Sequence, residues 1–234
     1  MSWVIVPAAG SGRRFGGDIP KQYLPLAGRP LIEHTLRALL ACDGIDGAVV
    51  ALAAGDTRWP GWRELEGKPV RACTGGDARA DSVLAALAAL PDDVAPDAFV
   101  LVHDAARPCI APADIAALLA ALRDEPVGAL LAAPVRDTLK RAGDDHRSTG
   151  TEPRERLWRA LTPQAFRRAE LAAALHAAAA AGVVATDEAM AFERLGRFPR
   201  LVEGRDDNLK VTTPADLAVA GMILARRAAT GADA

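Results

Sequence analysis

Short apolar runs alternate with longer helical segments along this chain, and that alternation restricts its fold more than any other feature. Buried strands are predicted at residues 3–7, 48–53, 70–74, 98–103 and 128–133. Helices are predicted between them, at residues 30–41, 79–90 and 112–123. Because such continuously apolar strands are typical of a sheet covered on both faces, the pattern predicts a doubly wound α/β fold with a mostly parallel sheet. Ligands of such folds bind at the carboxyl ends of the strands.

Residues 134–158 break this rhythm, because they are highly charged and carry turn signals at Gly143 and Gly150. A connection of this length in a compact domain is usually functional or disordered, and we expect a projecting hairpin arm. Beyond it, the sequence predicts helices at 164–181, 187–195 and 214–227, and extended segments at 200–202 and 208–211. There is no repeat or linker, so we expect residues 1–234 to form one domain, with 134–158 as its arm.

The composition excludes several functional classes. A net charge of −2 with 25% charged residues does not fit a polybasic nucleic-acid binder, so we expect no nucleic-acid partner. No stretch approaches the roughly 20 apolar residues of a membrane span, and the arginines near the N-terminus follow the first apolar run, which is the wrong order for a signal peptide. The odd cysteine count, at Cys42, Cys73 and Cys109, favours a reducing cytoplasm.

The first strand leads into a glycine-rich turn at residues 7–16, whose backbone amides can line an anion. The dinucleotide fingerprint would need glycine where Phe15 stands, and no P-loop motif occurs. Arg13, Arg14 and Lys21 add three cations within nine residues, which suits a polyphosphate. A simple tight turn would show the same glycines, but the added cations favour phosphate binding.

Two further segments place chemistry at strand ends. The fourth strand ends in Asp104 and Arg107, which could contact a ribose, a phosphate or Mg²⁺, or could form a structural ion pair. The glycine-containing segment 75–82 carries Asp77 and Ser82, which could read the edge of a base. The same residues would also suit the start of a helix, and both interpretations can hold.

Taken together, the motifs identify a family. They are PAAGSGRR with PKQYL, GGDARADSVL, LVHDAARP, APVRDTLKR, ALTPQ, TDEA and EGRDDNLKVT, in that order. From about residue 3 to residue 220 the chain resembles the 2-C-methyl-D-erythritol 4-phosphate cytidylyltransferases of the non-mevalonate isoprenoid pathway. The nearest alternatives are a ribitol 5-phosphate or other sugar-phosphate nucleotidyltransferase. A catalytically silent nucleotide-binding regulator is disfavoured, because Arg14, Lys21, Asp104 and Lys210 are all present.

The resemblance implies a Rossmann-like nucleotidyltransferase fold and transfer of a cytidylyl group from CTP to methylerythritol phosphate, with release of pyrophosphate. Because the attacking phosphate oxygen is already anionic near neutral pH, the reaction needs no general base; the task is positioning and charge stabilisation. Mg²⁺ is the implied cofactor, held mainly by the triphosphate, with Asp104 as a candidate ligand.

The resemblance also implies a role for each matched residue. The catalytic residues are Arg14 and Lys21. The nucleotide-binding residues are Ala8, Ala9, Gly10, Gly76, Asp77 and Ser82. The residues that face methylerythritol phosphate are Asp104, Arg107, Thr138, Arg154, Thr162 and Lys210.

In this family the arm, which here carries Thr138 and Arg154, reaches into the partner's site, so a homodimer is the implied state. The sequence leaves open whether Arg154 or Arg156 is the arm residue involved. Trp59 and Trp62 match no family motif, and we interpret them as surface or packing residues.

Overall fold

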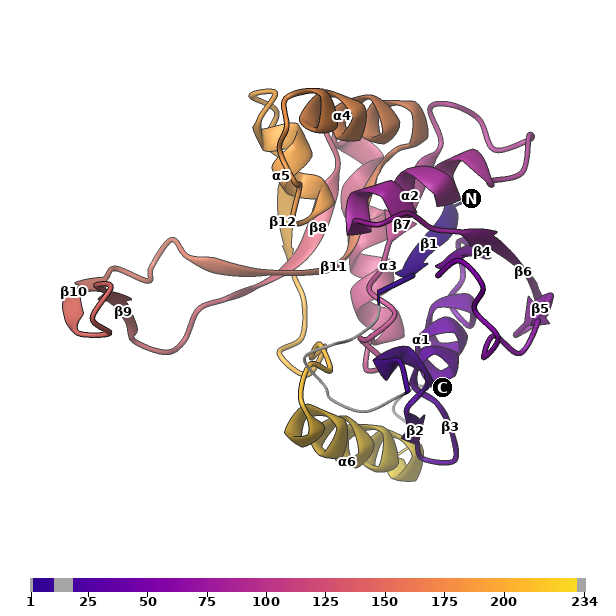
Figure 1. The fold of residues 1–234 in the computed structure, drawn as a ribbon, viewed down its shortest axis with the longest axis horizontal. Coiled ribbons are helices and arrows are strands. Elements are labelled where there is room, and N and C mark those ends of the chain that lie inside the picture. The colour runs from indigo at the N-terminus through magenta and orange to yellow at the C-terminus, as the bar shows by residue number, and fades with distance from the viewer. Residues whose placement is uncertain (1, 11–18, 231–234) are drawn as a thin grey trace.

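The computed structural model describes residues 2–10 and 19–230. Within these residues, eight strands form a central sheet in the order β12-β8-β11-β7-β1-β4-β6-β5 (Figure 1). The pairs β1–β4, β1–β7, β4–β6 and β8–β12 are parallel, whereas β11 runs antiparallel to β7 and β8, and β5 runs antiparallel to β6. The expectation of a mostly parallel sheet is therefore confirmed.

The elements have the following bounds. The strands of the central sheet are β1 (Ser2–Ala8), β4 (Ile45–Leu52), β5 (Glu64–Leu65), β6 (Lys68–Thr74), β7 (Phe99–Val102), β8 (Ala129–Pro134), β11 (Trp158–Arg167) and β12 (Arg200–Glu203). Two small hairpins are formed by β2 (Pro25–Leu26) with β3 (Arg29–Pro30), and by β9 (Leu139–Ala142) with β10 (Ser148–Glu152). The helices are α1 (Leu31–Leu40), α2 (Arg79–Ala88), α3 (Pro112–Ala121), α4 (Arg168–Ala180), α5 (Glu188–Glu193) and α6 (Pro214–Thr230), with short 3₁₀ turns at Lys21–Tyr23 and Leu122–Asp124.

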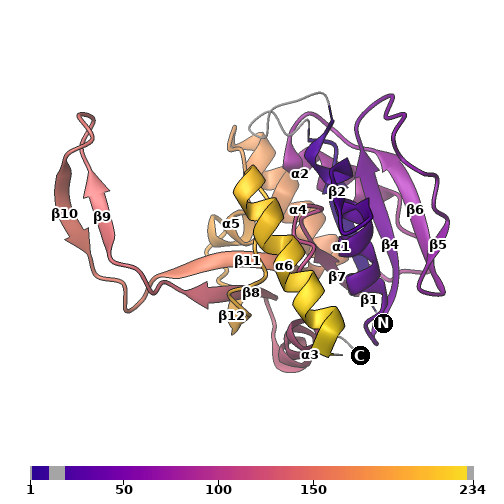
Figure 2. The same ribbon diagram turned by 90° about the horizontal axis from the view of Figure 1, so that it is seen from below.

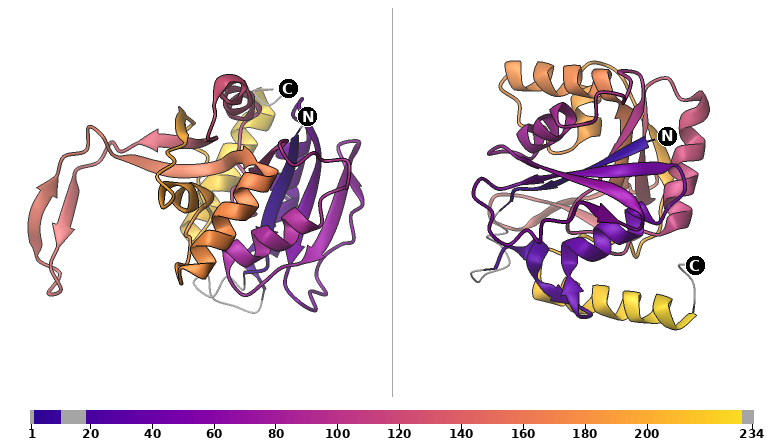
Figure 3. Two further views of the ribbon diagram at one scale, coloured as in Figure 1. Left: turned by 90° about the horizontal axis from the view of Figure 1, so that it is seen from above. Right: turned by 90° about the vertical axis from the view of Figure 1, so that its right-hand side faces the viewer.

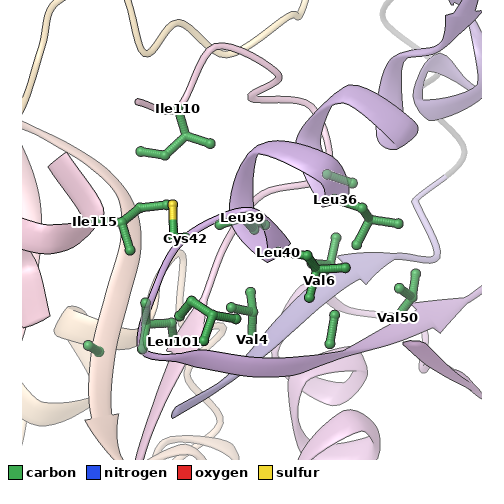
Figure 4. Packing of buried hydrophobic residues seen from close by; sticks show 14 of the residues in the cluster. Val4, Val6, Leu36, Leu39, Leu40, Cys42, Val50, Leu101, Ile110 and Ile115 are labelled. Atoms are coloured by element: carbon green, nitrogen blue, oxygen red, sulfur yellow. The ribbon is translucent and has the colours of Figure 1, made fainter. Parts of the chain in front are cut away.

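Helices cover both faces of the sheet (Figure 3). On one face, Val4, Val6 and Val50 of the sheet pack against Leu36 and Leu40 of α1, as Figure 4 shows, and α3 joins the same core. On the other face, the sheet packs against α2, α4 and α5. A strand such as β1 thus buries side chains in both directions, which is why its sequence is continuously apolar. The doubly wound α/β architecture predicted from the sequence is confirmed.

Trp59 and Trp62 lie in the loop after β4, where they form an edge-to-face pair with ring centroids 5.0 Å apart. Both are partly buried against the α1 side of the core. The interpretation as packing residues is therefore confirmed.

The helix α6 lies outside the main layers, beside the β2–β3 hairpin (Figure 1). It closes a smaller core that contains Leu26, Leu31, Ala106 and Val211. That core fixes the segment after β12 against the turn after β7, where the backbone N–H of Val211 donates to the carbonyl of Ala106 at 2.8 Å.

The strands β9 and β10 form an antiparallel hairpin that projects away from the body (Figures 1 and 2). Nearly all of its residues are exposed. At its base, Arg136 and Arg159, which lie on the outgoing and the returning chain, both pair with the carboxylate of Asp206. The projecting arm expected from the charged segment is present.

One expectation is wrong in detail. The helix expected at 164–181 begins only at Arg168, because residues 164–167 pair with β7 as the end of β11. There Phe166 is fully buried and stacks on Phe192 with ring centroids 4.2 Å apart, so tertiary packing overrides the local helical pattern. The segment 208–211, expected to be extended, pairs with no strand of the sheet, and the backbone N–H of Val211 instead donates to the turn after β7.

Candidate active site

A pocket of about 180 Å³ opens at the carboxyl ends of β1, β6 and β7. Most of the residues predicted for the site line it together: Ala8, Ala9, Gly10, Lys21, Gly76, Asp77, Ser82, Asp104 and Lys210. Gln22 and Arg79, to which sequence reasoning assigned no role, also line it. Arg14 lies outside the described residues.

The wall formed by residues 75–82 depends on close backbone packing. A Cβ on Gly76 would lie 2.4 Å from the Cβ of Asp81, so no larger residue fits without a shift of the backbone. The Ser82 hydroxyl accepts a hydrogen bond from the N–H of Gly76 at 3.2 Å, and it is almost fully buried. The carboxylate of Asp81 accepts from the N–H of Ala78 at 3.1 Å. Ser82 therefore lines the pocket and also fixes the backbone of Gly76 in this wall.

The segment that carries Lys21 is fixed to the end of β1. The buried side chain of Gln22 donates from Nε2 to the carbonyl of Ala8 at 2.8 Å. The Lys21 ammonium donates to the carbonyl of Val211 at 3.4 Å, on the segment that also carries Lys210. Two lysines from opposite ends of the sequence thus line the same pocket. Their positive charge suits an anionic ligand.

Asp104 is the electrostatic centre of the site. Its Oδ2 lies 2.8 Å from Nζ of Lys210 and 3.5 Å from Nε of Arg107, and its Oδ1 lies 3.1 Å from Nε of Arg79. Burial by itself would raise the pKa of this carboxyl, but the charges of Arg79, Lys210 and Arg107 hold it well below its ordinary value. Asp104 is therefore ionised throughout the neutral range.

Arg107 and Thr162 are buried, and neither of them lines the pocket. Arg107 donates from Nη1 to the carbonyl of Asn208 at 2.7 Å, and Asn208 donates from Nδ2 to the carbonyl of Thr162 at 2.8 Å. Thr162 Oγ1 accepts from the backbone N–H of Asp104 at 3.1 Å. In this structure the two side chains thus fix the Asp104 turn and the Lys210 segment to each other.

His103 completes this buried network. Its Nε2 lies 3.1 Å from the carbonyl of Arg107, which can only accept, so Nε2 carries the proton. Its Nδ1 is then the acceptor for the Thr162 hydroxyl, 3.0 Å away. Burial lowers the pKa of His103 to about 4, so the ring is neutral at physiological pH.

The predicted arm residues lie elsewhere. Thr138 and Arg154 are exposed and do not line the pocket of their own chain. Arg154 donates to the carbonyl of Arg136. The structure brings neither of them to the residues around Asp104.

Sequence reasoning gave no role to several buried or pocket-lining side chains, among them Gln22, Arg79, Glu188 and Asn208. Each lies inside a motif used for the resemblance, yet nothing in the spacing of those motifs shows which side chains pair. Arg79 and Glu188, for example, contact each other across 109 positions.

The fold and the pocket define an α/β nucleotidyltransferase: the carboxyl ends of parallel strands carry backbone amides, two lysines and an ionised carboxylate around one cavity. Residues 2–226 match the family model "2-C-methyl-D-erythritol 4-phosphate cytidylyltransferase", and this chain belongs to that family.

Relatives that carry this name are similar over almost the whole chain. The protein from Stenotrophomonas maltophilia strain K279a is 63% identical over 226 residues, which cover 97% of each chain. The one from Xanthomonas campestris pv. campestris strain 8004 is 64% identical over 230 residues, which cover 98% of this chain and 87% of the relative.

Solved structures that carry the same name are similar to this chain in fold. The Francisella tularensis structure is 32% identical, with a TM-score of 0.80 over 95% of this chain and 99% of that one. The Thermus thermophilus structure is 35% identical, with a TM-score of 0.75 over 95% and 98%.

Proposed function

We propose that this protein transfers the cytidylyl group of CTP to 2-C-methyl-D-erythritol 4-phosphate, giving CDP-methylerythritol and pyrophosphate. The family and the names of its relatives support this activity. The structural observation that carries it is the pocket in which Lys21 and Lys210 lie with the ionised Asp104 at the strand ends. A ribitol 5-phosphate or other sugar-phosphate nucleotidyltransferase is not favoured by these relatives.

In the proposed reaction, a phosphate oxygen of methylerythritol phosphate forms a bond to the α-phosphorus of CTP. The bond between that phosphorus and the bridging oxygen of the β-phosphate breaks, and its electron pair leaves with pyrophosphate. Lys21 and Lys210 stabilise the negative charge on the phosphate oxygens. Asp104 orients Lys210 through their 2.8 Å ion pair. We further propose the predicted contacts of Ala8, Ala9, Gly10, Gly76 and Asp77 with the nucleotide.

The cation Mg²⁺ fits this site as a partner of the substrate. Within residues 2–10 and 19–230, no group of three or more His, Cys, Asp or Glu side chains is arranged to hold a metal ion. The pocket does offer the carboxylate oxygens of Asp104, of the donor type that Mg²⁺ prefers, although Arg79 and Lys210 already contact them. We propose that triphosphate oxygens supply most of the ligands and that Asp104 contributes one. When bound, Mg²⁺ supplies positive charge against the charge that develops on the phosphates.

The metal proposal can be tested without turnover. Titration of Mg²⁺ into the CTP complex should tighten CTP binding, and the Asp104→Asn variant should require more Mg²⁺ for the same effect. CTP binding that is insensitive to Mg²⁺ would contradict the proposal.

We also propose that two chains form a homodimer, in which Thr138 and Arg154 of each arm reach the partner's pocket. Their absence from the lining of their own chain's pocket supports this arrangement. Arg154→Ala and Lys21→Ala should each suppress turnover, and mixing the two variants should restore part of it, because one pocket of a heterodimer keeps both side chains. Mixed variants that stay inactive while they exchange subunits would exclude a shared site.

We also propose that the protein is cytoplasmic. Its three cysteines, which form no disulfide, support this location. Among the described residues, none of the helices combines the length and the apolarity needed to cross a membrane.

The experiment that tests the proposed function is a pyrophosphate-release assay with Mg²⁺ over a panel of nucleotides and acceptors. The pair CTP and methylerythritol phosphate should give the highest kcat/KM, while ATP, GTP, UTP and ribitol 5-phosphate serve as comparisons. A higher kcat/KM with ribitol 5-phosphate would establish the alternative. Tight CTP binding with no pyrophosphate from any acceptor would instead indicate a silent regulator.

A further inference from the structure

Glu188 is a fully buried carboxylate that has no role in the reaction proposed above. It lies at the first turn of α5 and contacts Arg79 of α2 through two bonds, from Nη1 to Oε1 at 2.5 Å and from Nη2 to Oε2 at 3.1 Å. A paired fork of this kind fixes the guanidinium in both position and plane. Burying the pair costs several kcal/mol of desolvation per ion, and apolar residues of similar volume are often as stable. Fold stability by itself therefore does not account for Glu188.

The remaining side-chain nitrogen of Arg79, Nε, links this ion pair to the pocket. Its Nε lies 3.1 Å from Oδ1 of Asp104, while Oδ2 of Asp104 lies 2.8 Å from Nζ of Lys210. Glu188, Arg79, Asp104 and Lys210 thus form one row of alternating charge, which begins in the interior and ends at the pocket. The row joins α5, α2, the turn after β7 and the segment after β12.

The deep end of the row is held rigidly. Gln164 of β11 accepts from the backbone N–H of Ala189 at 2.9 Å and donates to the carboxylate of Asp187 at 2.9 Å. Both chain neighbours of Glu188 are therefore bound by one buried side chain. By contrast, the Lys210 side chain at the other end is 38% exposed.

We propose that Glu188 is a positioning residue for the transfer reaction: it holds the fork of Arg79, so that only Nε of Arg79 meets Asp104 and the second oxygen of Asp104 stays on Lys210. Without the Glu188 carboxylate, the fork of Arg79 turns to the nearest anion, which is Asp104. A two-bond pair between Arg79 and Asp104 draws that carboxylate away from Lys210. Lys210 then loses its fixed position in the part of the pocket that faces the phosphate acceptor. Glu188 touches no substrate and acts through Arg79.

The kinetic consequence rests on the proposed function, in which Asp104 and Lys210 face the phosphate acceptor. The variants are Glu188→Gln, Arg79→Lys and the double variant, because lysine keeps the charge of Arg79 but cannot make the fork. The matched control is Glu170→Gln, which breaks a partly exposed pair of 2.9 Å with Arg197. For each variant the KM for methylerythritol phosphate, kcat, the dissociation constant of CTP and the thermal midpoint are measured.

We expect Glu188→Gln to raise the KM for the acceptor about tenfold, and to change the CTP dissociation constant less than about threefold. Arg79→Lys should have a similar effect, and the double variant should be no worse than the worse single variant, because Glu188 acts only through Arg79. The control should match the wild type. Effects that multiply in the double variant, an unchanged acceptor KM, or acceptor and CTP binding that weaken in parallel would each overturn the proposal.

A crystal structure of Glu188→Gln separates this proposal from the proposed function. The contact between Lys210 and Asp104 should be lost in the variant, whereas in the wild type it is 2.8 Å. If the contact persists, the positioning role is wrong, whatever the assays show. If the contact is lost but the wild type releases no pyrophosphate from CTP and methylerythritol phosphate, Glu188 still controls the position of Lys210, and it is the proposed function that fails.

Discussion

The buried imidazole of His103 makes a quantitative prediction about how stability depends on pH. The folded protein holds this ring neutral, with a pKa of about 4, because burial disfavours its charged form. The unfolded chain has the ordinary value of 6.5. Between these two values the unfolded state binds a proton that the folded state does not, so acidification favours unfolding. Stability is therefore retained above pH 6.5 and is lost as the pH falls toward 4.

The size of this effect follows from the two pKa values. They differ by about 2.5, which at about 1.4 kcal/mol per pKa unit corresponds to roughly 3 kcal/mol once the pH is below both. Between pH 7 and pH 5 the loss from this one residue should be about 2 kcal/mol. This is a large fraction of the stability of an ordinary domain, which is about 5–15 kcal/mol.

The perturbation that isolates the residue is His103→Gln, which cannot titrate in this range. Urea unfolding is followed by tryptophan fluorescence at pH 7 and pH 5, at one protein concentration, for the wild type and the variant. The comparison uses the change between the two pH values, so any constant destabilisation by the substitution cancels, and so does the titration of the other groups. The wild type should lose about 2 kcal/mol more than the variant. Equal losses in the two proteins would refute the assignment of a neutral buried ring.

Three further substitutions test separate parts of the structure. Lys21→Ala should lower kcat by about 10²–10³ without a change in circular dichroism, and near-normal turnover would exclude its catalytic role. Gly128→Ala should lower the unfolding free energy by about 2–4 kcal/mol in urea, because φ is +132° and the new Cβ would lie 2.4 Å from Phe166; an unchanged midpoint would contradict this steric argument. Asp187→Ala should cost about 1–2 kcal/mol, since its carboxylate caps α5 at the N–H of Met190 (2.9 Å); equal stability would show that the cap is dispensable.

The outline of this fold could be predicted because its strands are apolar on both faces. The run at β1 is such a case, since Val4 and Val6 pack on the α1 side of the sheet and Ile5 packs on the other. The strand β11 could not be found in the same way. Its last residues read as the start of a helix, and only the neighbouring β7 and the stacking of Phe166 on Phe192 fix them in the sheet.

The pocket could be predicted from strand ends, because parallel strands bring their carboxyl ends to one edge. That rule places Gly10, Asp77 and Asp104 together, and the structure does the same. It carries no information about which charged side chains pair. The contacts of Asp104 with Arg79 and Lys210 depend on the packing of α2 and on the smaller core under α6, so they follow from the tertiary structure alone.

The β9–β10 hairpin has a consequence for local opening of the chain. Its two strands are almost wholly exposed and contribute no residue to the described cores. The hairpin can therefore open locally, at a free energy that does not depend on the unfolding free energy of the rest of the domain. A two-stranded ribbon is only marginally stable in water. Its backbone amides should therefore exchange with deuterium at rates near those of an unstructured peptide in dilute protein, and should slow down as the concentration rises if a second chain covers the hairpin. Exchange in the arm then reports association directly, while amides of β1, protected by the full unfolding free energy, stay unchanged.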